Sequence, residues 1–206
     1  MNIEQSLKQQ GLNLTNEQIK LCEDYLSLLD KWNRVYNLTS IQTLEERVTK
    51  HLLDSFSVAP YIKGKRILDV GSGAGLPGIP LAIYYPDYLF TLLDANSKKT
   101  AFLAQCRRSL NLTNIDVIHH RIENYQVKDA FDSIICRAFS SLSDFVAQTR
   151  HLLADDGILL AMKGQYPQQE LAELAQHGVI YQTHRLDVPG LDAQRHMVII
   201  TGASSG

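Results

Sequence analysis

The chain has 206 residues, of which 45% are hydrophobic and 20% charged, a composition that excludes an intrinsically disordered protein. Its 20 lysines and arginines stand against 22 aspartates and glutamates, so the formal net charge is −2. No overall positive field exists, and any nucleic-acid site must therefore be a local basic patch.

Cysteine usage and apolar runs suggest a cellular compartment. The three cysteines are widely spaced, which fits neither a disulfide framework nor a metal site. The longest apolar runs are about five residues, against the roughly 20 that a membrane span needs, and the first ten residues lack a signal-peptide pattern. We therefore expect a cytoplasmic protein with reduced thiols, no bound metal and no membrane association.

Residues 1–64 are expected to form a helical appendage. Thr15 and Gln18 have the spacing of a capping box, and apolar residues at helical spacing follow them. Trp32 and Tyr36 lie in this apolar stripe, which favours core packing over stacking on an RNA base. A second helical stripe runs through Leu44, Val48, Leu52 and Phe56.

Residues 65–206 are expected to form a separate α/β domain, because short apolar runs alternate with helical stretches. The expected strands are 66–70, 88–93, 115–119, 133–136, 158–162, 179–186 and 196–201, and the expected helices are 77–85, 98–110, 142–153 and 168–176. This pattern predicts a seven-stranded sheet with helices on both faces. The connection 187–195 is too short for a parallel crossover, so we expect the last strand to be antiparallel.

The strongest motif follows the first strand, where Gly71, Gly73 and Gly75 precede Pro77 and a helix. Such a loop lets a ligand approach the backbone at the carboxyl end of a parallel strand. Gly73-x-Gly75-x-x-Gly78 also matches the dinucleotide fingerprint, which is weak evidence on its own. Asp69 instead favours S-adenosylmethionine, because a carboxylate suits a cationic cofactor better than a pyrophosphate.

A second acid, Asp94, ends the next expected strand, 23 residues after Gly71. A carboxylate there suits the ribose hydroxyls of any adenosine cofactor. The alternative is a cap for the helix that follows.

The segments after the third and fourth strands bear on the chemistry. The segment from Asp69 to Gly75 resembles the first motif of class I methyltransferases, and in their layout the loop with Ile122 and Glu123 lies against the adenine. Arg137 follows the fourth strand, where it can fix the cofactor or a phosphate. Cys136 lacks the context of a pyrimidine-methylating nucleophile and is expected to be buried. No amine-binding motif is present either, so an acceptor that already has a free lone pair, such as guanine N7, fits best.

The sequence as a whole resembles the RsmG (GidB) family of bacterial 16S rRNA methyltransferases. The motifs that carry the resemblance are Lys31-Trp-Asn-x-x-Tyr-Asn-Leu-Thr-Ser40, His51-x-x-Asp-Ser55, Asp69-x-Gly-x-Gly-x-Gly-x-Pro-Gly-Ile-Pro80, Arg137-Ala138, Lys163-Gly164 and Arg195-His196. The departures from the family pattern are Ala74, Cys136, Lys50 and Gln194, which stand where Pro, Ser, Arg and an acid are usual.

The resemblance implies a class I methyltransferase fold and methyl transfer from S-adenosylmethionine to N7 of one guanine, position 527 of 16S rRNA, with S-adenosylhomocysteine as the product. The resemblance and the glycine motif together predict the following cofactor-binding residues: Gly71, Leu76, Asp94, Ile122, Glu123, Arg137, Asp69 and Gly73. The expected RNA-binding residues are Lys50, His51, Lys163, Arg195 and His196. No catalytic residue is assigned.

We expect a monomer acting on 16S rRNA or on a precursor of the small ribosomal subunit. Three alternatives stay open: a methyltransferase of another RNA or a small molecule, a nucleotide-dependent oxidoreductase, and a non-catalytic RNA-binding or assembly protein.

Overall fold

The computed structural model describes residues 3–201; residues 1–2 and 202–206, at the ends of the two predicted segments, lie outside this range. In chain order the elements are α1 (Ile3–Gln9), α2 (Asn16–Tyr36), α3 (Leu44–Arg47), η1 (Val48–Leu53), α4 (Asp54–Phe56), η2 (Ala59–Tyr61), β1 (Arg66–Val70), α5 (Gly78–Tyr84), β2 (Leu89–Asp94), α6 (Ser97–Ser109), β3 (Ile115–His119), η3 (Ile122–Asn124), β4 (Phe131–Cys136), α7 (Leu142–Thr149), η4 (Arg150–Leu152), β5 (Leu153–Lys163), α8 (Gln168–Gln176), β6 (Ile180–Arg185) and β7 (His196–Thr201).

The predicted seven-stranded sheet is confirmed, with the strand order β3-β2-β1-β4-β5-β7-β6. The first five strands pair in parallel, and β7 is antiparallel to both β5 and β6. The order reverses direction between β1 and β4, whose carboxyl ends lead into the glycine loop and into Arg137. Ligands of open parallel sheets bind at such a switch point.

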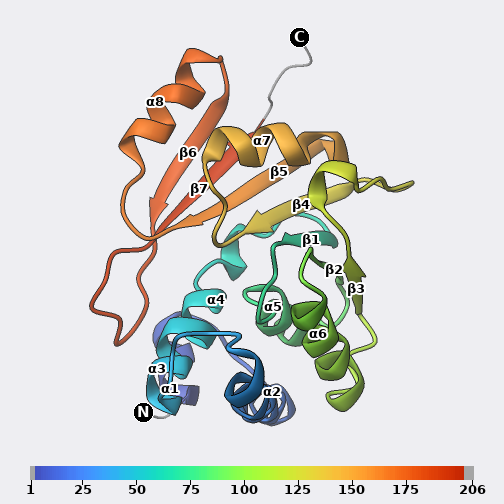
Figure 1. Ribbon diagram of the computed structural model, residues 1–206. Helices are drawn as coiled ribbons and strands as arrows, with labels where there is room; N and C mark the ends of the chain where they lie inside the picture. Colours follow the sequence, from blue (N-terminus) through green and yellow to red (C-terminus); the bar gives the residue numbers. More distant parts are fainter. Residues whose placement is uncertain (1–2, 202–206) are drawn as a thin grey trace.

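Helices cover both faces of the sheet (Figure 1). One face carries α5 and α6, and one buried cluster joins their apolar side chains to those of α2, η1 and α4. The other face carries α7 and α8 over a second buried cluster. The N-terminal helices therefore share the core of one face of the sheet.

Helix α2 contacts the sheet domain through polar bonds as well as apolar packing. The predicted capping box is present, with reciprocal bonds between Thr15 and Gln18. The Gln18 amide also donates to the Ile83 and Tyr84 carbonyls at the end of α5. Trp32 packs against Phe102 of α6, with ring centroids 5.6 Å apart, which agrees with core packing. The same prediction is wrong for Tyr36, which is 42% exposed at the end of α2.

Three predicted elements differ from the structure. The stripe from Leu44 to Phe56 is not one α-helix, because a π-helical segment, η1, interrupts it and Leu44 is exposed. The predicted helix 142–153 ends at Thr149, and β5 begins at Leu153 rather than at residue 158. Residues 154–157 are mostly polar or Gly, so only the pairing of Leu153 with Phe131 shows that the strand starts earlier.

No helix within residues 3–201 is both long enough and apolar enough to cross a membrane.

Candidate functional site

The glycine loop is held from below by Asp69 and Leu93. One carboxylate oxygen of Asp69 accepts from the Gly78 N–H at 3.0 Å, and the Leu93 carbonyl accepts from the Gly71 and Ser72 N–H groups. A Cβ at Gly78 would lie 2.6 Å from that Asp69 oxygen, so this contact requires glycine. Gly71 has a φ of +69° and open space where a Cβ would stand, as expected for a position that a ligand approaches.

Asp94 joins this loop to β2. Its two oxygens accept from the Gly73 N–H at 2.9 Å and from the Asn96 N–H at 2.8 Å, and Lys99 lies 3.8 Å away. Asn96, and not Asp94, caps helix α6 through bonds from Lys98 and Lys99. A carboxylate offers about four acceptor positions, so Asp94 keeps capacity for ligand hydroxyls.

A first cavity of about 330 Å³ opens at these strand ends, a size typical of small-ligand sites. Its walls combine backbone, a carboxylate, a short helical turn and an aromatic ring, and they are formed by Val70, Gly71, Leu93, Asp94, Ala95, His120, Arg121, Ile122, Glu123, Ala138, Phe139, Ser140 and Gln148. Four of the eight predicted cofactor residues meet here: Gly71, Asp94, Ile122 and Glu123.

The other four predicted cofactor residues lie outside the lining. Gly73 is next to it and donates to Asp94, and Leu76 is buried in the core. Asp69 is fully buried beneath the loop, and burial raises its pKa to about 7. Within residues 3–201 its second oxygen, Oδ1, has no hydrogen-bond partner. Arg137 turns away toward a second cavity.

The second cavity has a volume of about 350 Å³ and a strongly basic wall. Its lining residues are Thr39, Ser40, Ile41, Lys50, His51, Asp54, Arg137, Met162, Lys163, Gly164 and Arg195. Four of the five predicted RNA-binding residues therefore meet here, although they come from segments up to 145 residues apart in the sequence. Since Arg137 lines this cavity and Ala138 lines the first, the two cavities flank one peptide bond at the end of β4.

Both predicted RNA-binding histidines are buried. His51 lies between the Lys50 carbonyl, 3.0 Å from Nδ1, and the Thr39 hydroxyl, 2.9 Å from Nε2. The carbonyl only accepts, so Nδ1 carries the proton and Nε2 accepts from Thr39. Burial, aided by the charge of Arg137, lowers the pKa of His51 to about 4. His196 bonds the Gly164 carbonyl and packs on Tyr166, beneath the rim rather than in the lining.

Asp54, which no sequence pattern predicted as a site residue, lies between Arg195 and Arg137 in the second cavity. Its only sequence signal is its place in His51-x-x-Asp-Ser55. Cys136 is buried, as predicted, and burial raises the pKa of its thiol, so it does not supply a thiolate at neutral pH.

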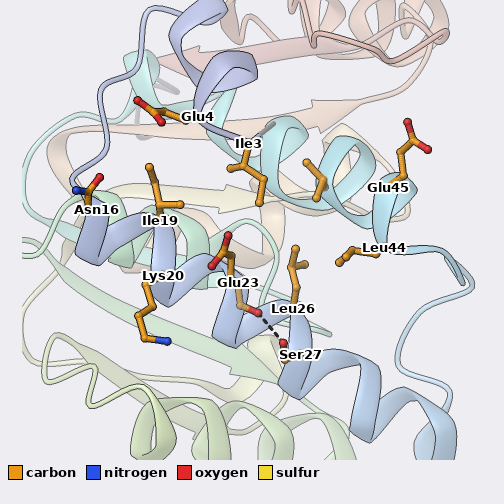
Figure 2. A pocket seen from close by; sticks show the side chains of 11 residues that line it. Ile3, Glu4, Asn16, Ile19, Lys20, Glu23, Leu26, Ser27, Leu44 and Glu45 are labelled. Carbon is orange, nitrogen blue, oxygen red and sulfur yellow. Dashed lines mark hydrogen bonds between the residues drawn. The ribbon is translucent and has the colours of Figure 1, made fainter. Parts of the chain in front are cut away.

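A larger cavity, with a volume of about 850 Å³, lies between α1, α2 and α3 (Figure 2). Its lining includes Glu4, Glu23 and Glu45 but a single lysine, Lys20, together with apolar side chains. The balance of charge is unfavourable for a polyanion, and the lining of this cavity shares no residue with the linings of the other two.

Comparisons with known proteins agree with this architecture. A family model described as "GidB: rRNA small subunit methyltransferase G" matches residues 18–198. The ribosomal RNA small subunit methyltransferase G of Chromobacterium violaceum is 52% identical over 197 residues, covering 95% of this chain and 94% of its own. That of Nitrosococcus oceani is 50% identical and covers 99% of this chain and 95% of its own.

Two solved structures show the same fold at low identity. A SAM-dependent methyltransferase from Aquifex aeolicus has a TM-score of 0.62 at 16% identity, covering 76% of this chain and 93% of its own. Magnesium protoporphyrin IX methyltransferase from Synechocystis PCC 6803, with bound SAM, has a TM-score of 0.60 at 18% identity, covering 92% and 99%.

Proposed function

Because this chain belongs to the GidB, or rRNA small subunit methyltransferase G, family, we propose that it methylates N7 of one guanine in 16S rRNA, at position 527 of that RNA. It is an enzyme that takes the methyl group from S-adenosylmethionine and releases S-adenosylhomocysteine. The observation that supports this best is the pair of cavities on either side of the Arg137–Ala138 peptide bond, one lined by the glycine loop and the other basic.

The first cavity suits the cofactor. Asp94 would accept from the ribose hydroxyls, the η3 turn with Ile122 and Glu123 would lie against the adenine, and the open space above Gly71 would admit the cofactor's approach. Asp69 fits a role beneath the loop, where it holds Gly78 and has one buried oxygen to spare. Leu76 and Gly73 would act by shaping the loop.

The second cavity suits the nucleotide that accepts the methyl group. S-adenosylmethionine, when bound, supplies a methyl group on a positively charged sulfur. Guanine N7 has a free lone pair and no proton to lose, so the chain need not supply a base. The positive charge would move from sulfur to the guanine ring on transfer, and the two cavities would contribute the acceleration by aligning N7 with the methyl group.

The RNA contacts follow from the same placement. Lys50, Lys163 and Arg195 line the second cavity and would contact RNA directly. His51, a buried part of the same lining, and His196 would act by fixing loops. We divide the chain into a helical appendage, residues 1–64, and a catalytic domain, residues 65–206. We further propose a monomer, and the substrate implies a cytoplasmic enzyme that acts on rRNA or on a small-subunit precursor.

The test is transfer of labelled methyl from S-adenosylmethionine to unmodified 16S rRNA, with a matched transcript in which the target is 7-deazaguanosine. We expect label in 7-methylguanine for the normal RNA and none for the 7-deaza RNA, which lacks the accepting lone pair. Equal labelling of both transcripts, or transfer only to a small molecule, would overturn the proposal. Stabilisation in a thermal melt by NAD, but not by S-adenosylhomocysteine, would point to an oxidoreductase instead.

A further inference from the structure

Asp54 is a buried carboxylate between two arginines in the basic cavity. Its side chain is 3% exposed, Oδ1 accepts from Arg195 Nε at 2.7 Å, and Arg137 Nη1 lies 3.7 Å from Oδ2. The three residues come from the start of α4, the end of β4 and the segment before β7. One acid thus links the helical appendage to two ends of the sheet domain.

Backbone carbonyls near Asp54 and Arg195 also bind the two arginine side chains or the Asp54 N–H group. In the π-helical segment, the Asp54 N–H donates to the Thr49 and His51 carbonyls, while the Lys50 carbonyl accepts from Arg137 Nη1 at 3.3 Å and from the His51 ring. Arg195 Nη1 donates to the Gln194 carbonyl at 2.8 Å. A guanidinium has five N–H donors, so each arginine retains donors beyond these bonds.

The charges of the cavity are not balanced evenly. Lys163 is paired with Glu170 at 2.8 Å and Lys50 with Glu46 at 2.7 Å, which leaves each lysine largely compensated. Arg137 and Arg195 share the single carboxylate of Asp54, so this triad carries one net positive charge. Two guanidinium groups held close together in a recess match the geometry of a phosphate.

We propose that Asp54 is a positioning residue that holds Arg137 and Arg195 as a two-armed site for one backbone phosphate of the RNA substrate beside the target guanosine. This inference rests on the proposed function, because it assumes that RNA enters the second cavity. Asp54 itself repels a phosphate. Its charge alone would therefore weaken RNA binding, whereas its positioning role strengthens it.

These opposite signs make Asp54→Asn a decisive variant. Asparagine preserves the size of the side chain but removes the charge that holds two like charges together. We expect the KM for 16S rRNA to rise about tenfold, on the scale of one charge-assisted bond, while the Kd for S-adenosylmethionine changes less than twofold. The slope of log KM against log salt should also become shallower by about 0.7 for the lost phosphate contact.

Asp156→Asn is the matched control, because it makes the same change in net charge at an exposed carboxylate paired with Lys63. Asp156 lies seven residues from Lys163 along β5, about 23 Å away. This control should leave the KM for RNA unchanged or slightly lower. An Asp54→Asn enzyme with an equal or lower KM for RNA than wild type would overturn the proposal.

Arg195→Lys provides a second test should Asp54→Asn fold poorly. It retains the positive charge but loses the forked guanidinium that binds Asp54, so we expect a raised KM for RNA and a shallower salt slope. Wild-type values for this variant would refute the site. Failure of the proposed function would look different, because the wild-type enzyme itself would then transfer no methyl to 16S rRNA.

Discussion

Replacing Tyr25 with Phe removes one oxygen from the protein and tests whether the helical appendage supports the cofactor loop. The Tyr25 hydroxyl donates to the Ala74 carbonyl at 2.7 Å, and the side chain is completely buried on α2. Loss of the donor leaves a buried carbonyl unpaired, which costs about 1–3 kcal/mol. For a chain of this size, that lowers the Tm by roughly 2–12 °C.

The same change should weaken cofactor binding, although Tyr25 does not line the first cavity. Ala74 lies within the glycine loop, so a less ordered loop must be ordered when the cofactor binds. We expect the Kd for S-adenosylmethionine, measured by titration calorimetry, to rise about three- to tenfold, which corresponds to part of the lost bond.

Tyr85→Phe is the matched control, because the Tyr85 hydroxyl donates to the Ala59 carbonyl at 3.0 Å, away from the loop. Both variants should be less stable than wild type, and only Tyr25→Phe should bind the cofactor more weakly. An unchanged Kd for Tyr25→Phe, or an equal rise in both variants, would refute the reasoning.

Three further predictions concern the site. Asp94→Asn should raise the Kd for S-adenosylmethionine tenfold or more, because the amide replaces one of the two oxygens that accept from Gly73 and Asn96 with a donor and leaves too few acceptor positions for the ribose. Asp116→Asn, at an exposed carboxylate 3.7 Å from Arg107, should leave this Kd unchanged in the same titration. Gly71→Ala and Gly178→Ala each place alanine at a φ near +69° with open space around it, so chemical denaturation should show similar losses of about 1–2 kcal/mol. Only the Gly71 change should prevent cofactor binding, and binding by this variant would contradict the assigned cavity. The depressed pKa of His51, about 4 when folded against 6.5 when unfolded, means that the unfolded state binds more protons between these values. The contribution of neutral His51 to the free energy of unfolding should therefore rise by about 3 kcal/mol as pH increases from 4 to 6.5. The free energy of unfolding of wild type should accordingly exceed that of His51→Gln by an amount that grows over this range. A difference that stays constant with pH would contradict the depressed pKa of His51.

Local signals in the sequence determined most of the fold. The capping box at Thr15, the alternation of apolar runs after Gly64 and the short connection 187–195 each depend on neighbouring residues, and each prediction is confirmed. The predictions that failed depend on distant partners. The early start of β5 is set by the pairing of Leu153 with Phe131, and the π-helical segment follows no periodicity that the stripe from Leu44 to Phe56 shows.

The candidate site divides in the same way. The sequence by itself identified the glycine loop and Asp94, because both lie at strand ends whose position can be read from a few adjacent residues. Only the tertiary structure decided that Arg137 faces the second cavity rather than the first, and that Asp54 joins it to Arg195. Asp54 and Arg195 are 141 residues apart, and no local pattern specifies which side chains meet when a helical appendage packs against the end of a sheet.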